Sequence, residues 1–299
     1  VGAGHTLLRT QHRLAARFEK VDLPTHARVL DYGCGKASTL KGLCGRRDDV
    51  VPFVFDVGEQ YRPFWNDFVS ADSRAIGEVP AEGTGQRDAG LSFFALEHVA
   101  DPRTFVRAVH GLLKESGVFY FLVPNIFANT ADLVVADHVN HFSAQSLDRL
   151  LADAGFVVRE INDEAHNSAW VIVAEKAEDV GVDLEIESVS QSVRDIAAYW
   201  DGFGDRVSAF ENAGQSAAAI YGSGFYGTFI HASLVQPEAV LCFLDRNPHR
   251  QQQTLLQKPI MEPDALPEQV RRLYVGLNPR VAKAELAAVP LPELEVFFP

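Results

Sequence analysis

Short apolar segments of strand length alternate with amphipathic helical segments along the first half of the chain. Apolar residues return at helical spacing over residues 4–19, and again beyond the helix start at Asp101-Pro102, over residues 105–112. Strands are predicted for residues 28–30, 51–57, 68–72, 88–99 (with the exit loop) and 117–125. Such alternation is typical of a doubly wound α/β sheet, in which ligands bind at the carboxyl ends of the strands.

The remaining pattern predicts the end of this sheet, a linker and a second α/β domain. Two strand-like runs within residues 156–175 are expected to form a closing antiparallel pair, and the acidic stretch 176–187 is expected to be a linker. A helical pattern then covers residues 189–212, and strands are predicted for 217–221 and 240–245. We therefore place the first domain at residues 1–178 and a smaller second domain at residues 179–299.

A glycine-rich turn follows the first predicted strand, in the run Asp31-Tyr-Gly33-Cys-Gly35. Glycines at such a turn let the backbone bend sharply and approach a ligand closely. A carboxylate just before the turn would repel the pyrophosphate of a dinucleotide, whereas it attracts ammonium and sulfonium charges. Asp31 therefore favours S-adenosylmethionine over a nicotinamide dinucleotide as the ligand.

Three further residues stand at or near predicted strand ends. Asp56 lies roughly 20 residues after Gly35, the spacing at which an acid reaches a ribose diol; a solvated turn aspartate is the alternative. Asp72 ends the third predicted strand and is either a ligand-binding acid or a surface acid. Phe94 packs either on an adenine ring or in the core. With Asp31, these residues are expected along one edge of the sheet.

Two segments resemble class I S-adenosylmethionine-dependent methyltransferases. Motif I of that family is similar to Asp31-x-Gly33-x-Gly35-x-Ala37, with Ala37 in place of the usual glycine, and its LEHV segment is similar to residues 96–99. The resemblance implies a Rossmann-like methyltransferase sheet whose donor site is shaped by the motif I acid and glycines. It also implies that Asp56 binds the ribose and Asp72 the adenine amino group. In relatives the acid–histidine pair of LEHV is more often structural than catalytic.

A cluster of Asp137, His138 and His141 precedes a predicted helix that Ser143 would cap. The segment resembles the EH-x-x-Y/H-F-S segment of sugar C-methyltransferases, in which a histidine lies near the sugar. A methyl acceptor must lose a proton, and a histidine suits that role, with a neighbouring carboxylate to orient it. The resemblance thus implies His138 as base, assisted by Asp137 and His141. The alternative is that the histidines bind the backbone beneath the helix.

The second domain carries its own glycine motif, Gly222-x-Gly224-x-x-Gly227, followed by a strand that ends at Asp245. Alone, this is a dinucleotide-binding pattern and supports a rival function, an NAD(P)-dependent oxidoreductase. Its surroundings resemble the C-terminal Rossmann-like domain of sugar C-methyltransferases, which implies a part in the acceptor cleft and glycines that serve tight packing. A third possibility is a methyltransferase-like module that binds without turnover.

Composition limits the partners. The formal net charge of −13 across 299 residues argues against nucleic acid and anionic membranes. The resemblance to sugar C-methyltransferases implies a small-molecule acceptor, a sugar or a nucleotide-linked sugar. Three cysteines without a C-x-x-C pair predict neither disulfides nor a metal site, and a cytoplasmic location. The chain begins at Val1, and the zinc-binding domain that precedes the catalytic domain in sugar C-methyltransferases is not visible, which leaves C- versus O-methylation open.

Overall fold

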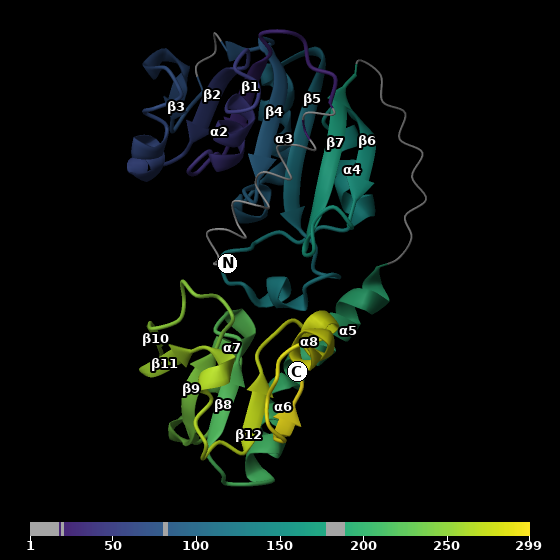
Figure 1. The fold of residues 1–299 in the computed structure, drawn as a ribbon. Coiled ribbons are helices and arrows are strands. Elements are labelled where there is room, and N and C mark those ends of the chain that lie inside the picture. Colours follow the sequence, from purple (N-terminus) through teal and green to yellow (C-terminus); the bar gives the residue numbers. More distant parts are fainter. Residues whose placement is uncertain (1–17, 19–20, 80–82, 178–188) are drawn as a thin grey trace. The chain divides into compact units, whose positions relative to one another are not determined.

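The computed structural model describes residue 18 and residues 21–79, 83–177 and 189–299 (Figure 1). The described residues form two compact units. The first unit contains residues up to 128 together with 134–189, and the second contains Asn129–Leu133 and Ser190–Pro299. The predicted domain boundary at residue 178 and most of the predicted helix 4–19 lie outside the described residues.

The first unit is built on a seven-stranded sheet with the order β3-β2-β1-β4-β5-β7-β6. Its strands β1 to β5 run parallel, and β7 is antiparallel to both of its neighbours, β5 and β6. This confirms the predicted doubly wound α/β class and the closing antiparallel pair. The strands are β1 (Arg28–Tyr32), β2 (Val51–Asp56), β3 (Arg74–Ile76), β4 (Arg87–Phe93), β5 (Leu113–Pro124), β6 (Phe156–Asn162) and β7 (Ala169–Lys176).

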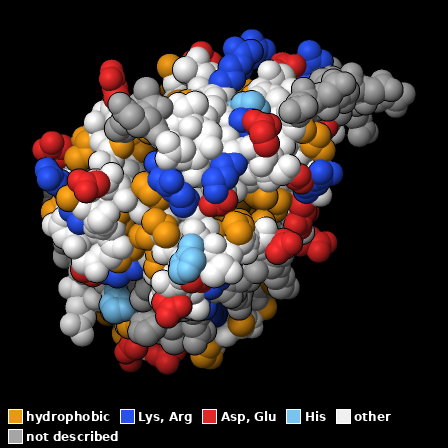
Figure 2. All heavy atoms as spheres, turned by 90° about the horizontal axis from the view of Figure 1, so that it is seen from above, with side chains coloured by type: hydrophobic (Ala, Val, Ile, Leu, Met, Phe, Trp, Pro, Cys, Tyr) orange, Lys and Arg blue, Asp and Glu red, His pale blue; other side chains and the backbone are white. Residues whose placement is uncertain are grey.

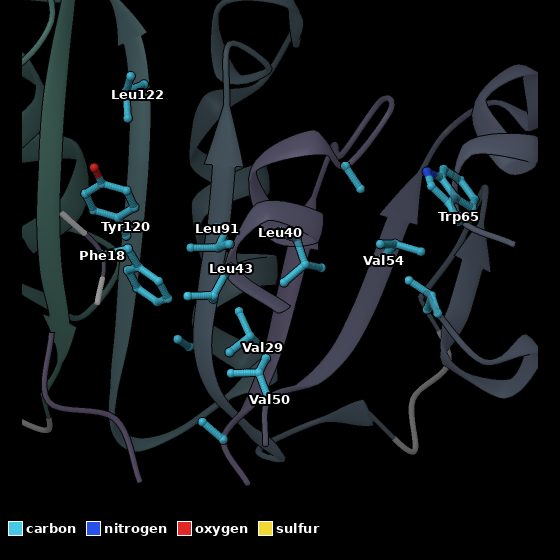
Figure 3. Packing of buried hydrophobic residues seen from close by; sticks show 14 of the residues in the cluster. Phe18, Val29, Leu40, Leu43, Val50, Val54, Trp65, Leu91, Tyr120 and Leu122 are labelled. Carbon is cyan, nitrogen blue, oxygen red and sulfur yellow. The ribbon is translucent and has the colours of Figure 1, made fainter. Parts of the chain in front are cut away.

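Two apolar clusters cover the two faces of this sheet. Neighbouring residues of β5 alternate between them: Tyr120 lies in one cluster, and Phe119 and Phe121 lie in the other. The first cluster includes Leu40 and Leu43 of helix α2 (Ser38–Cys44), which Figure 3 shows beside Val29 and Leu91 of the sheet. The second includes residues of α3 (Pro102–Leu112) and α4 (Ala144–Ala152). The central strands are therefore buried on both faces, as a parallel sheet requires.

The helix starts of the first unit confirm two predictions. The Asp101 carboxylate accepts hydrogen bonds from the backbone amides of Arg103 and Thr104, with Pro102 at the first helical position. Ser143 caps α4 and accepts from the amide of Ser146, whose hydroxyl accepts in return from the Ser143 amide.

The third predicted strand is wrong. Residues 68–72 form turns and the start of the 3-10 helix η2 (Ala71–Ser73), and strand β3 begins only at Arg74. Val69 is buried in the core, and its carbonyl oxygen accepts hydrogen bonds from the Arg74 guanidinium. The apolar side chains of this stretch pack into the core from a turn, and its backbone does not pair with a strand of the sheet.

The second unit holds a six-stranded sheet with the order β10-β11-β9-β8-β12-β13, which confirms a second α/β sheet in the C-terminal region. The predicted helix over 189–212 is interrupted at Gly202. Its strands are β8 (Ala218–Tyr221), β9 (Val240–Leu244), β10 (Thr254–Leu255), β11 (Lys258–Met261), β12 (Arg272–Val275) and β13 (Glu295–Phe297). Its helices are α5 (Ser190–Asp201), α6 (Phe203–Asn212), α7 (Phe225–Ser233) and α8 (Pro279–Ala287).

A five-residue segment that follows β5 in the sequence, Asn129–Leu133, packs within the second unit. The indole N–H of Trp200 donates to the carbonyl of Thr130 at 2.7 Å. The hydroxyl of Tyr226 bonds to the Asn129 side chain at 3.1 Å and accepts from the amide of Ala131 at 3.1 Å. Among the described residues, the second unit is therefore assembled from two separate stretches of the chain.

None of the helices in the described part of the chain is long and apolar enough to cross a bilayer. On the face shown in Figure 2, Lys and Arg side chains stand among Asp and Glu side chains.

Candidate functional site

The glycine turn after β1 is shaped as a cradle. Gly33 has a φ of 73°, and a Cβ added there would lie 2.8 Å from the Cβ of Ala95, so only glycine fits this position. At Gly35, with a φ of 49°, an added Cβ would meet only the Tyr61 ring, at 3.9 Å. The turn is thus packed against the protein at Gly33 and open to a ligand at Gly35.

Asp31 lies beneath this turn at the end of β1 and is 2% exposed. Burial, followed by the negative charge of Asp56, raises the pKa of the Asp31 carboxyl well above its usual value. Its Oδ1 atom has no hydrogen-bond partner among the described residues. A buried carboxylate oxygen in this state favours a cationic hydrogen-bond donor, which is what an amino acid moiety with a sulfonium group offers.

Asp56 ends β2 and holds the turn in place. One carboxylate oxygen accepts from the amide of Gly35 at 2.8 Å, and the other from the amide of Gly58 at 3.2 Å. The residue is 8% exposed, so the solvated turn aspartate is excluded. An ionised carboxylate has about four acceptor positions, so two bonds leave capacity for the hydroxyls of a ribose.

Asp72 lies at the wrong edge of the sheet for the predicted role. Strands β2 and β3 are parallel with Asp56 opposite Ile76, so Asp72 precedes the amino end of β3. Glu78, by contrast, follows the carboxyl end of β3, beyond Gly77, whose amide donates to the Asp56 carbonyl at 3.0 Å. Sequence reasoning missed this acid, although a glycine and an acid directly after the short run Arg74-Ala-Ile76 were the available signal.

Phe94 follows β4 at the carboxyl edge, as predicted, but it does not pack in the core. Its side chain is 39% exposed, and its ring meets the His166 ring edge-on with centroids 5.6 Å apart. The backbone has a φ of 54°, an unusual value for an aromatic residue, and its amide donates to the carbonyl of Leu122. The ring is therefore accessible at the ligand edge.

The predicted acceptor cluster folds onto the turn that contains Glu97 and His98. The Glu97 carbonyl accepts from the amides of Val139 and Asn140, at 2.9 and 3.2 Å. The rings of His98 and His138 lie edge to face with centroids 4.8 Å apart. The structure thus joins His138 to a histidine that sequence reasoning had treated as structural.

Asp137 contacts His98 in this structure. The Nδ1 atom of His98 lies 3.0 Å from the Asp137 carbonyl oxygen and 3.5 Å from its carboxylate. Because a carbonyl can only accept, Nδ1 carries a proton, so that a neutral His98 ring has its lone pair on Nε2. Asp137 therefore orients His98, whereas the sequence suggested that it orients His138. His141 lies further along the same loop and is half-buried.

The glycine motif of the second unit is committed to packing. A Cβ at Gly227 would lie 2.0 Å from the Gly222 carbonyl oxygen, and one at Gly222 would lie 2.4 Å from the Gly276 carbonyl oxygen. Asp245, the acid at the end of β9, accepts from the amide and hydroxyl of Ser223. These contacts support a packing role for Gly222 and Gly227, whereas a Cβ added at Gly224 would meet only the Arg250 guanidinium, at 3.9 Å.

Comparisons with known proteins agree with the geometry of the first unit. The family model described as a methyltransferase domain matches residues 5–161. A ubiquinone biosynthesis O-methyltransferase of Xanthomonas oryzae pv. oryzae (strain PXO99A) is 29% identical over 169 residues, which cover 55% of this chain and 65% of that protein. The match thus leaves about a third of the relative's length uncovered.

Solved structures are similar over more than half of this chain. A chain from the complex of the Haloferax volcanii Trm112 methyltransferase activator with a methyltransferase aligns with a TM-score of 0.49 and 15% identity, over 57% of this chain and 91% of that chain. The Burkholderia thailandensis 1,6-didemethyltoxoflavin-N1-methyltransferase, solved with S-adenosylhomocysteine, aligns with a TM-score of 0.44 and 18% identity, over 59% and 82% of the two chains.

The family model covers more than half of the chain, including β1, the glycine turn and the His98–His138 region. It confirms the predicted S-adenosylmethionine-dependent methyltransferase domain, and we conclude that the chain belongs to the methyltransferase domain family.

Proposed function

We propose that this protein transfers the methyl group of S-adenosylmethionine to a hydroxyl of a small-molecule acceptor, a sugar or a nucleotide-linked sugar. The observation that carries the proposal is the buried carboxylate of Asp31 beside a glycine turn that is closely packed at Gly33 and open at Gly35. That arrangement suits a ligand with an ammonium and a sulfonium group, and it opposes a pyrophosphate.

Each part of the donor has a residue of suitable chemistry at this edge. Asp31 binds the cationic amino acid end, and Asp56 accepts from the ribose hydroxyls while it holds Gly35. Glu78, in place of Asp72, accepts from the adenine amino group. Bound there, S-adenosylmethionine supplies a methyl group on a positively charged sulfur, which makes that carbon electrophilic.

The acceptor must lose its proton as the new bond forms. The acceptor oxygen bonds to the methyl carbon while the sulfur–carbon bond breaks and its electron pair stays on sulfur. We assign the proton to His138, whose ring lies against His98 at the site formed by the 135–143 loop. In-line positioning of oxygen, carbon and sulfur supplies most of the rate enhancement.

A sugar acceptor and a hydroxyl acceptor are supported by different observations. The 136–143 segment resembles that of sugar C-methyltransferases, which supports a sugar. The Xanthomonas relative is named for O-methylation in ubiquinone biosynthesis, which supports a hydroxyl. The nicotinamide alternative has less support, because the family model ends at residue 161 and does not reach the glycine motif of the second unit.

The test is methyl transfer from methyl-labelled S-adenosylmethionine to a panel of nucleotide sugars, free sugars and phenols. We expect one acceptor class to be labelled, and His138→Ala to reduce kcat at least a hundredfold with S-adenosylhomocysteine affinity unchanged. Asp72→Asn is the matched control and should be as active as the wild type. Hydride transfer from a nicotinamide substrate, or full activity of His138→Ala, would contradict the proposal.

A further inference from the structure

The side chains of Glu97, His98 and His138 form a compact group of possible metal ligands. Their ligand atoms all lie within 4.8 Å of one another, and they are the one such group found in the described part of the chain. Glu97 is 1% exposed, whereas the His98 side chain is 39% exposed. The group therefore combines a buried carboxyl group, that of Glu97, with the His98 side chain, which is accessible to solvent.

We propose that this group binds a divalent transition-metal ion, such as Zn²⁺ or Co²⁺, beside the methyl acceptor. One carboxylate and two imidazoles are a common ligand set of catalytic zinc sites, which leave a further position for water or substrate. The inference rests on the proposed methyl transfer, because it assigns the ion a part in holding the acceptor hydroxyl.

The orientation of His98 is that of a metal ligand with its supporting hydrogen bond. Its Nδ1–H donates to the Asp137 carbonyl, which leaves the other ring nitrogen, Nε2, for an ion. Nε2 lies 3.9 Å from Oε1 of Glu97, too far for a hydrogen bond between the two atoms. A neutral imidazole nitrogen and a buried carboxylate oxygen at this distance favour a cation between them.

Small movements would complete the coordination. Metal–ligand bonds of about 2.1 Å place tetrahedral ligand atoms about 3.4 Å apart, so the widest separation, 4.8 Å, must shorten. His138 lies in an irregular part of the 135–143 loop, outside any helix or strand, where its backbone can shift toward the buried Glu97. Glu97 and His98 lie in the short 3-10 turn η4 (Leu96–His98) and need not move far.

The ion would change how the acceptor loses its proton. A hydroxyl held by a divalent cation has a lowered pKa, so the O–H proton passes to water before the oxygen bonds to the methyl carbon. His138 is then a ligand, whereas in the absence of an ion it is the base described above. The ion and the His138 imidazole without an ion are alternative routes for the same proton, and an experiment can separate them.

The test is a titration of the full-length, chelator-treated protein with Co²⁺, followed by visible absorption and calorimetry. We expect one equivalent to bind with micromolar or tighter affinity and to give the absorption of a histidine-ligated ion. His98→Ala and His138→Ala should each weaken binding at least tenfold. His26→Ala, an exposed histidine outside the group, is the matched control and should bind like the wild type.

Two results would overturn the metal site: no Co²⁺ binding to the wild type, or binding by both histidine variants with the affinity of the wild type. S-adenosylhomocysteine binding to the same samples separates this failure from that of the proposed function. If the cofactor product binds and Co²⁺ does not, His138 remains a base without a metal. If Co²⁺ binds and the product does not, the donor site fails and the metal site stands. Because the two variants lie in different segments, misfolding of one leaves the other as the test.

Discussion

At the scale of single residues, the proposed donor site contains groups that destabilise the folded chain. Asp31 buries a carboxylate, and Gly33 occupies a backbone conformation and a space that no other residue shares without strain. Such costs persist where they serve a ligand. The residues that a cofactor would contact are therefore those whose replacement should separate binding from stability.

The pH dependence of stability should reveal Asp31. Because its pKa is raised in the folded state, its contribution to the free energy of unfolding is present below the unfolded pKa of about 3.9 and is lost as pH rises through the folded pKa. We expect Asp31→Asn, which has no titrating group there, to gain in Tm relative to the wild type as pH rises. Thermal melts of the ligand-free proteins between about pH 4.5 and 8 measure this. A difference in Tm that is constant with pH would contradict it.

Gly33→Ala should damage both the fold and the cofactor site. The added Cβ would lie 2.8 Å from the Cβ of Ala95, and the alanine would have to adopt the positive φ of Gly33. Together these effects should lower the free energy of unfolding by about 1–3 kcal/mol. Denaturant unfolding and S-adenosylhomocysteine titration measure the two effects. Gly42→Ala in α2 is the matched control: nothing lies within 4 Å of its added Cβ, and we expect about 0.5–1 kcal/mol of stabilisation. Equal stability of the two variants would rule out the tight cradle.

At the scale of helices and strands, the sequence predicted what local patterning determines. The long buried strands, the caps at Asp101 and Ser143 and the glycine turn could be predicted because each depends on adjacent residues. Strand β3 could not, because its three half-buried residues carry too little alternation, and the apolar residues before it belong to a turn. Because of that error the adenine-binding role was predicted for Asp72, whereas we propose it for Glu78.

The pairing of His98 with His138 also could not be predicted, because it joins segments that are far apart in the chain. The contact depends on the Glu97 carbonyl oxygen, which accepts hydrogen bonds from the backbone amides of Val139 and Asn140. Backbone hydrogen bonds of this kind leave no side-chain signature.

The cap of α4 should contribute measurably to the loop that carries His138. We expect Ser143→Ala to lower the free energy of unfolding by about 1 kcal/mol, because the helix loses the acceptor for the Ser146 amide. Denaturant unfolding measures the loss. Ser143→Asp, which can still cap, should retain most of the stability, and a loss equal to that of the alanine variant would show that capping is not the cause.

At the scale of the whole molecule, the chain folds into two units, and a short segment from within the sequence of the first unit belongs to the second. Asn129–Leu133 is held there by Tyr226 and Trp200. Sequence reasoning placed a simple boundary between consecutive domains and missed this insertion, since a short loop carries no periodicity that would assign it to a distant sheet.

Tyr226→Phe should loosen that segment. The substitution keeps the ring but leaves the buried amide of Ala131 without its acceptor, which costs about 1–3 kcal/mol. Hydrogen exchange at Ala131 and denaturant unfolding should both show the loss. Tyr274→Phe is the matched control, because no hydrogen bond to the Tyr274 hydroxyl is found among the described residues. Unchanged protection at Ala131 in Tyr226→Phe would contradict this view of the second unit.

The central claim is that the first unit binds the donor through Asp31, and calorimetric titration with S-adenosylhomocysteine, NAD and NADP tests it most directly. We expect micromolar binding of S-adenosylhomocysteine alone, weakened at least tenfold, or about 1.4 kcal/mol, in Asp31→Asn and unchanged in Asp72→Asn. Binding of a nicotinamide dinucleotide alone, or full affinity of Asp31→Asn for S-adenosylhomocysteine, would contradict the claim.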